Sequence, residues 1–112
     1  MLRLLGMDLR GHLDLLLLKT LRDDGPAHGY AIIASLRDRS HGTFDLPEGT
    51  VYPALYRLER DGLVGSEWDA SAARRRRVYS LTKAGSAALG ERRKAWGRFS
   101  QAVDTALEGG RA

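Results

Sequence analysis

Glycine and proline divide this chain of 112 residues into short segments, and the positions of these breaks constrain its fold more than any other feature. At Asp24-Gly25-Pro26 a glycine follows the last residue expected to be helical, and the proline cannot continue the helical hydrogen bonds. Ser40-His41-Gly42 and Gly62 make two similar breaks. Three segments of helical length therefore precede residue 62, and each must bury an apolar face against the others.

The first helix is predicted over Gly11 to Asp23, and its leucines cover two faces. Most of them recur at helical spacing and form one stripe. Leu15 and Leu18 point to the opposite side, so they predict contact with a partner beyond the domain's own core. The main stripe consists of Leu13, Leu16, Leu17, Thr20 and Leu21.

The second helix is predicted over Ala27 to Arg39, and its buried face has two possible compositions. Both recur at helical intervals, so periodicity does not choose between them. The alternatives are Tyr30, Ile33 and Leu36, or their neighbours Ile32 and Ala34.

The third helix is predicted from Pro47 to Asp61. Inside a helix that starts at Pro47, Pro53 removes one backbone hydrogen bond, which favours a later start at Gly49 or Thr50, or a kink. The apolar stripe of this helix consists of Val51, Ala54, Leu55 and Leu58.

Two short strands are predicted over Leu63 to Trp68 and Arg76 to Thr82, because both segments alternate and are rich in β-branched and aromatic residues. The short segment Asp69-Ala70-Ser71-Ala72-Ala73, followed by the first arginines, separates the two strands, so they are expected to form a hairpin. Its tip carries the consecutive arginines Arg74 to Arg77. The residues expected to face inward are Tyr79 and Leu81.

A long final helix is predicted over Lys83 to Leu107. Leu89, Trp96 and Val103 recur every seven residues in it, with Phe99 between them, which is the spacing of a helix-helix seam. Because such a helix is stabilised mainly by packing, the seam must meet another helix. The expected organisation is a domain over residues 1–82, a dimerisation helix over residues 83–107 and a flexible tail over residues 108–112.

Composition excludes several classes of protein. With 43% hydrophobic and 29% charged residues the chain is expected to be globular. It has no cysteine, and its histidines and carboxylates lack ligand spacing, so neither a disulfide, a metal nor another cofactor is expected. Charged residues interrupt the leucine-rich start, which supports neither a signal peptide nor a membrane span and makes the cytoplasm the expected compartment.

Three helices followed by a hairpin, with a tight turn between the second and third, is the order of a winged helix-turn-helix. The predicted fold class is mainly α with a small β-hairpin, plus a long C-terminal helix.

The net charge of +4 is concentrated locally at the arginine run, as in phosphate-binding surfaces. Opposite the apolar stripe of the third helix, Gly49 permits close approach to a DNA groove, and Tyr56 and Arg57 can reach base edges. The predicted DNA contacts are Thr50, Tyr52, Pro53, Tyr56, Arg57, Arg60, Arg74, Arg75, Arg76 and Arg77.

Three runs are distinctive: Gly25-Pro26-Ala27-His28-Gly29-Tyr30, Gly49-Thr50-Val51-Tyr52-Pro53-Ala54-Leu55 and Arg76-Arg77-Val78-Tyr79-Ser80-Leu81-Thr82. With the residues around them, from roughly Leu13 to Gly85, they resemble the PadR-like transcriptional regulators. The resemblance implies a winged helix-turn-helix closed by a dimerising helix, with ligand-controlled repression of a nearby promoter. Because one long helix follows the wing, the chain resembles the short branch of that family. The chain departs from the family pattern at Ala73, where glycine is usual, and at Val78-Tyr79, where an aromatic pair is usual.

The resemblance also implies an effector site and a homodimer. In some short-branch relatives a tryptophan of the last helix faces its symmetry mate and sandwiches planar aromatic ligands, and Trp96 falls at the matching place. Arg92 and Arg93 precede it by one turn, so the expected effector is an anionic aromatic compound, with plain dimer packing as the alternative. Two reading helices related by a two-fold axis imply a pseudo-palindromic operator in double-stranded DNA. The expected dimer contacts are Leu15, Leu18, Leu89, Trp96, Phe99 and Val103.

Two other classes of function need to be separated from DNA binding. A winged-helix module can bind another protein without binding DNA. Salt dependence distinguishes the two, because a protein that neutralises phosphates loses affinity steeply as salt rises. An enzyme is not expected, since the sequence offers no nucleophile paired with a base, no glycine-rich phosphate loop and no metal cluster.

Overall fold

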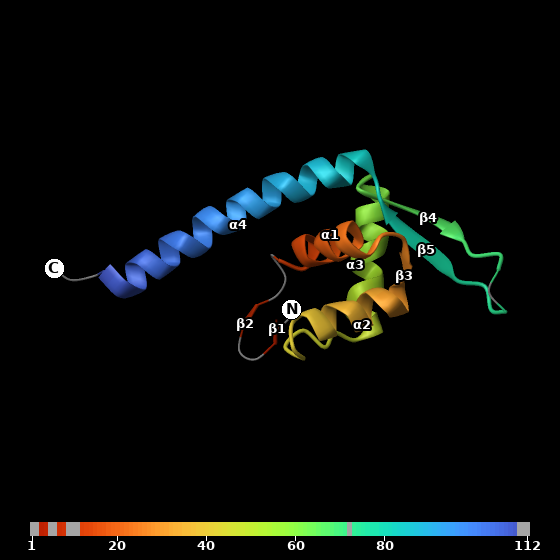
Figure 1. The fold of residues 1–112 in the computed structure, drawn as a ribbon, viewed down its shortest axis with the longest axis horizontal. Coiled ribbons are helices and arrows are strands. Elements are labelled where there is room, and N and C mark those ends of the chain that lie inside the picture. Colours follow the sequence, from red (N-terminus) through yellow and green to blue (C-terminus); the bar gives the residue numbers. More distant parts are fainter. Residues whose placement is uncertain (1–2, 5–6, 9–11, 72, 110–112) are drawn as a thin grey trace.

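The computed structural model describes residues 3–4, 7–8, 12–71 and 73–109. The molecule measures 62 × 28 × 23 Å, because a hairpin and the far end of the last helix extend in opposite directions (Figure 1). The elements in chain order are β1 (Arg3–Leu4), β2 (Met7–Asp8), α1 (Leu13–Asp24), β3 (Ala27–His28), α2 (Gly29–Arg39), α3 (Glu48–Arg60), β4 (Val64–Trp68), β5 (Arg77–Leu81) and α4 (Lys83–Gly109).

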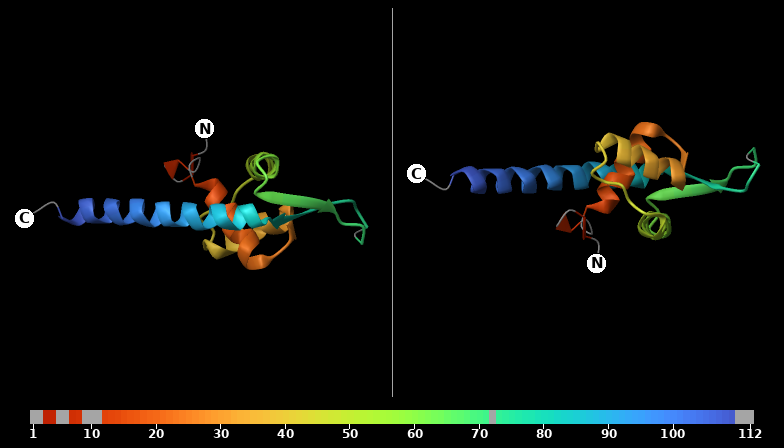
Figure 2. Two further views of the ribbon diagram at one scale, coloured as in Figure 1. Left: turned by 90° about the horizontal axis from the view of Figure 1, so that it is seen from above. Right: turned by 90° about the horizontal axis from the view of Figure 1, so that it is seen from below.

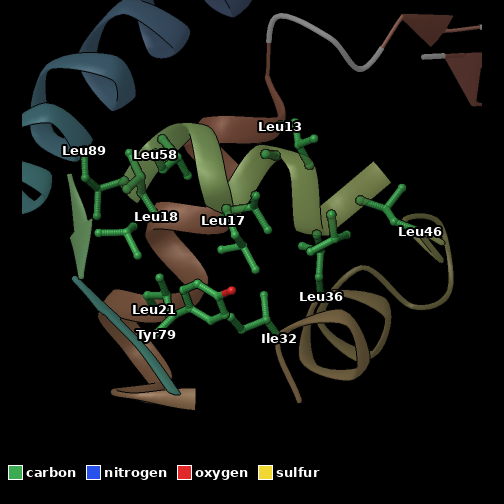
Figure 3. Close-up of a cluster of buried hydrophobic side chains, with 14 residues drawn as sticks. Leu13, Leu17, Leu18, Leu21, Ile32, Leu36, Leu46, Leu58, Tyr79 and Leu89 are labelled. Atoms are coloured by element: carbon green, nitrogen blue, oxygen red, sulfur yellow. The ribbon is translucent and has the colours of Figure 1, made fainter. Parts of the chain in front are cut away.

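The core forms around α1, which contacts α2, α3, β5 and α4. Its leucines meet apolar side chains from each of these elements, and the ring of Tyr79 lies beside Leu21 and Ile32 (Figure 3). The prediction that Tyr79 faces inward is confirmed, since its side chain is buried. The predicted stripe of α3 is confirmed in full: Val51, Ala54, Leu55 and Leu58 are all buried.

The two apolar faces of α1 are both used within one chain. Leu18 is completely buried, so the prediction that it faces a partner outside the core is wrong. The cause is that α4 returns across α1 and covers its second face, as the contact between these helices shows. Leu15 is half-buried and packs against the edge of the same core.

Helix α2 buries Ile32 and Leu36, one residue from each of the two predicted sets. Tyr30, which belongs to the first of these sets, is 69% exposed. The reason is that Tyr30 precedes Ile32 by two residues, about 200° around the helix, so it lies on the face opposite the buried one.

The sheet has three strands in the order β3-β5-β4, and all neighbours are antiparallel. The hairpin of β4 and β5 matches the predicted one to within a residue at each end. Strand β3 was not predicted: Ala27 pairs with Tyr79, and His28 pairs with Val78. A strand of two residues is too short to show alternation, so only its pairing with β5 reveals it.

Helix α3 begins at Glu48, between the two predicted starts. The amide of Val51 donates to the carbonyl of Pro47 at 3.2 Å, so the first turn is closed. Pro53 lies inside the helix, which continues to Arg60. At the other end, Gly62 has φ +79°, as predicted. Its amide donates to Glu59 and the next amide donates to Leu58, which is the Schellman arrangement.

Helix α4 has two parts. Gly85 and Leu89 are buried against the domain, whereas nearly every residue from Gly90 onward is exposed. Leu89 therefore belongs to the core of the single chain, and the prediction that it lies on a joint between two chains is wrong. The helix reaches Gly109, two residues beyond its predicted end, and the remainder of the predicted tail lies outside the described residues. Among the described helices, none combines the length and apolarity needed to cross a bilayer.

The crossing of α4 over the hairpin depends on a missing side chain. A Cβ on Gly85 would overlap the carbonyl oxygen of Leu63 and lie 2.8 Å from Cδ1 of Leu81. Gly85→Ala should therefore lower the free energy of unfolding by about 1–3 kcal/mol, the usual range for forcing extra volume into a packed site. Thermal and denaturant unfolding measure this change.

Gly90→Ala is the matched control, because a Cβ at Gly90 meets nothing within 4 Å. It should raise stability by about 0.5–1 kcal/mol through helix propensity alone. Equal effects of the two substitutions would contradict the close packing at Gly85.

Candidate nucleic-acid interface

The outer face of α3 is uncovered. Figure 2 views α3 nearly end-on and shows it at one side of the molecule. Gly49, Pro53, Tyr56 and Arg60 are exposed opposite the buried stripe, and Thr50 at its flank is half-buried. Small groups near the start of the helix and long polar side chains further along allow such a face to approach a groove of DNA closely.

Arg57 differs from the residues of this exposed face because its side chain lies against α1. Its Nη2 donates to Oδ1 of Asp14, in the first turn of α1. Oδ2 of the same carboxylate accepts a hydrogen bond from Nη1 of Arg92 in α4, 3.4 Å away. One carboxylate therefore links an arginine of the third helix to an arginine of the last helix.

Tyr52 lies on the other flank of α3 and is half-buried. Its ring packs over Gly29, where a Cβ would be 2.5 Å from Cζ of Tyr52, so a larger residue there would displace the ring. Its ring centroid is 6.1 Å from that of Tyr56. Burial, with a smaller contribution from Glu48, raises the pKa of the Tyr52 hydroxyl above its ordinary value. The phenol therefore keeps its proton at neutral pH and can donate a hydrogen bond.

The hairpin carries its arginines in two different environments. Arg74, Arg75 and Arg76 are exposed beyond the end of the paired strands. The guanidinium of Arg75 lies 4.3 Å from the ring centroid of Trp68, and that of Arg77 lies 4.9 Å from it. Cation-π contacts of this kind at exposed sites are worth about 0.5–1 kcal/mol. Trp68 therefore restricts where Arg75 points.

Arg77 connects the hairpin to α3. Its Nε donates to Oγ of Ser66 at 2.9 Å, and its Nη2 lies 3.6 Å from Oε2 of Glu59. Oγ of Ser66 in turn donates to the same oxygen of Glu59 at 2.5 Å. Arg77 was predicted at the tip of the hairpin, but it lies in β5, where these bonds position the hairpin relative to the third helix.

Asp69 organises the turn at the end of the hairpin. Its amide donates to the carbonyl of Arg76 at 2.7 Å, and its carboxylate accepts hydrogen bonds from the hydroxyl and the amide of Ser71 at 2.6 and 3.0 Å. These two bonds from Ser71 lower the pKa of Asp69 below its ordinary value. The carboxylate also lies 3.5 Å from Nε2 of His28 in β3, so the turn is anchored to the third strand of the sheet.

A hollow of about 500 Å³ lies between α1 and the middle of α4. The ring of Trp96 forms one wall and meets that of His12 edge-on, with the centroids 5.0 Å apart. Arg92 lines the hollow, whereas Arg93 does not. The other lining residues are Asp14, Leu15, Ala95 and Phe99.

A second hollow of about 520 Å³ lies between α1 and α3, and Asp14 belongs to the walls of both. Thr50, Pro53 and Arg57 of the candidate DNA contacts line this second space. The acidic side chain therefore stands between the hollow at Trp96 and the flank of α3. No cluster of three side chains able to hold a metal ion occurs in the part of the chain that the structure describes.

Sequence analysis missed four residues that organise this surface: Asp14, Glu59, Ser66 and Trp68. Trp68 could have been found, because the predicted hairpin places it opposite Arg77 in a cross-strand pair. Asp14 left no such signal, since its partners are 43 and 78 residues away in the sequence.

Comparisons with known proteins agree with this architecture. The model of the PadR-like transcriptional regulator family matches residues 17–91. A Mycobacterium tuberculosis protein named Transcriptional regulator Rv3488 is 42% identical over 80 residues, which are 71% of this chain and 72% of that protein. An uncharacterised protein of Lysinibacillus sphaericus is 30% identical over 102 residues, which cover 90% of this chain and 93% of the relative.

Solved structures give the same result. A PadR family transcriptional regulator of Eggerthella lenta superposes with a TM-score of 0.79 at 37% identity, covering 89% of this chain and 85% of that one. A transcriptional regulator of Clostridium thermocellum superposes with a TM-score of 0.80 at 26% identity, covering 87% and 94%. With the family match over more than half of its length, the chain belongs to the PadR-like family of transcriptional regulators.

Proposed function

We propose that this protein is a dimeric, sequence-specific DNA-binding regulator, a repressor whose hold on its operator is modulated by a small aromatic effector. The observation that carries the proposal is the uncovered outer face of α3 beside a hairpin with three exposed arginines. Small and polar groups on the helix suit the major groove, and cations on the hairpin suit the neighbouring phosphates. Such a protein acts by binding and not by catalysis, in the cytoplasm.

The second copy is proposed to lie along the far part of α4. One stripe of this helix runs from Gly85 and Leu89, which are buried, to Trp96, Phe99 and Val103, which are 42%, 59% and 38% exposed. Large apolar side chains that continue a buried stripe without cover favour association with a second helix. The proposed dimer interface, called the joint below, therefore consists of Leu15, Trp96, Phe99 and Val103. Leu18 and Leu89 are not part of it, because they are buried in the core of one chain.

Val103→Asp tests this joint. The side chain is exposed in a single chain, so the substitution should leave the fold intact and shift the protein from dimer to monomer. Thr105→Asp adds the same charge about half a turn away and should leave the dimer unchanged. Light scattering and sedimentation measure the mass, and a monomeric wild type or a dimeric Val103→Asp variant would count against the joint.

Two reading helices in such a dimer would meet successive major grooves about 34 Å apart, in a pseudo-palindromic operator. The proposed contacts divide by type. Thr50 and Tyr52 at the flanks of α3 suit phosphates, Pro53 and Tyr56 face the groove, and Arg57 and Arg60 can reach base edges. Arg74, Arg75 and Arg76 suit the phosphates beside the site, and Arg77 positions the hairpin.

Arg75→Ala and Arg76→Ala test the phosphate contacts. Each should weaken binding to an operator selected from genomic fragments and to random duplex DNA alike. Each should also reduce the slope of log affinity against log salt by about 1. Fluorescence anisotropy at several salt concentrations measures both quantities.

Arg98→Ala is the control for the arginine test, because it removes the same charge from an exposed site on α4, far from the hairpin. It should leave the slope nearly unchanged. Loss of affinity for one sequence only would make these arginines base readers. A wild type indifferent to duplex DNA in dilute buffer would instead favour a module that binds protein.

The effector is proposed to enter the hollow at Trp96 as a flat aromatic anion, which Arg92 attracts. Trp68 is the second tryptophan, so a Trp68→Phe background leaves Trp96 as the single fluorophore. A panel of aromatic carboxylates that includes 2-naphthoate should quench its emission saturably. Trp96→Phe, which retains Trp68, should show no saturable change. An unresponsive Trp96 across the panel would remove the effector from the proposal.

A further inference from the structure

We infer that Asp14 is a positioning residue that makes DNA binding by Arg57 and anion binding by Arg92 compete with each other. The inference rests on the proposed function, since it concerns how that DNA surface is regulated. It follows from a single carboxylate that holds both guanidinium groups, Arg57 through Oδ1 and Arg92 through Oδ2.

The position of Asp14 suits this role. It lies in the wall of the hollow beside Trp96 and in the wall of the hollow beside α3. Its side chain is 25% exposed, whereas those of Arg57 and Arg92 are 43% and 42% exposed. The carboxylate is therefore the more enclosed partner, and each arginine has a free side that an incoming ligand can approach.

DNA has to take Arg57 away from Asp14. Nη2 of Arg57 donates to Asp14 and keeps the guanidinium beside α1, so a two-bond contact with a guanine edge requires the guanidinium to leave this position. In the free protein the carboxylate holds Arg57 against α1, and part of the affinity for DNA is used to release it. Asp14 therefore weakens DNA binding by an amount that depends on how strongly it holds Arg57.

That strength depends on Arg92. While Arg92 donates to the second oxygen, it draws negative charge away from Arg57 and makes its release easier. An anion in the hollow that pairs with Arg92 takes this arginine away from Asp14. Asp14 then binds Arg57 more strongly and keeps it from DNA. DNA that binds Arg57 in turn lets Asp14 pair more strongly with Arg92. Arg92 is then less available to the anion, so the anion binds more weakly. The two ligands are then negatively coupled, and such coupling acts equally in both directions.

Asp14→Asn is the first test, because the amide keeps the shape and removes the charge. It should raise affinity for duplex DNA about two- to fivefold, the upper part of the range for partly exposed ion pairs. Structural damage would lower the affinity instead. Asp38→Asn removes the same charge from an exposed site on α2 and corrects for the general effect of net charge.

The gain must require Arg57. In an Arg57→Ala background, Asp14→Asn should change DNA affinity no more than Asp38→Asn does. In the wild type, saturating 2-naphthoate should weaken operator binding about two- to fivefold, and in Asp14→Asn this effect should be largely lost. A gain that survives without Arg57 would overturn the inference.

Arg92→Gln and Arg93→Gln provide a second route that leaves Asp14 in place. Both remove one positive charge from adjacent exposed positions of α4, but only Arg92 contacts Asp14. Arg92→Gln should lower operator affinity more than Arg93→Gln, because Asp14 then holds only Arg57. This comparison decides the matter if Asp14→Asn proves unstable.

The outcomes separate the inference from the proposed function. A wild type that binds no duplex DNA contradicts the proposed function. A wild type that binds its operator, with Asp14→Asn equal to Asp38→Asn and Arg92→Gln equal to Arg93→Gln, leaves the function standing and overturns the role of Asp14.

Discussion

Burial of both apolar faces of α1 is the constraint on which the rest of the structure depends. Leu17, Leu18 and Leu21 are essentially inaccessible to solvent, and each contributes about 1.5–3 kcal/mol by leaving water. Two apolar faces on one helix need two covers, and the chain supplies both by folding α4 back across α1. The first turns of α4 are used in this way, so the outer face of α3 and the far part of α4 are the surfaces left for partners.

The fold was predictable where a short stretch of sequence determines the conformation. The stripe of α3, the glycine that ends it and the inward direction of Tyr79 all follow from periodicity or from a single backbone requirement. The errors arise where distant segments decide. Periodicity shows that Leu18 is off the main stripe, but it cannot show that residues 83–89 return to cover it. The pairing of Ala27 with Tyr79 has the same origin.

The candidate site divides in the same way. That Gly49, Pro53, Tyr56 and Arg60 lie on an exposed face follows from the position of the buried stripe. The ion pairs of Arg57 and Arg77 do not follow from it, because arginine is compatible with any exposed position, and the tertiary fold selects its carboxylate. Sequence reasoning therefore finds which surface is presented, whereas the structure shows which arginines on it already have partners.

Salt acts on the exposed arginines and on the paired arginines in different ways. Arg74, Arg75 and Arg76 are exposed at the hairpin tip. The other arginines connect elements: Arg57 joins α3 to α1, and Arg77 joins the hairpin to α3. Arg92 joins α4 to α1 through Asp14. All these pairs are partly exposed and are screened at high ionic strength. In the proposed function, added salt therefore weakens the attraction of the exposed arginines for phosphate and also loosens the contacts that orient α3. A count of arginines alone would describe only the first of these effects, since Arg57, Arg77 and Arg92 hold the protein's own elements in place.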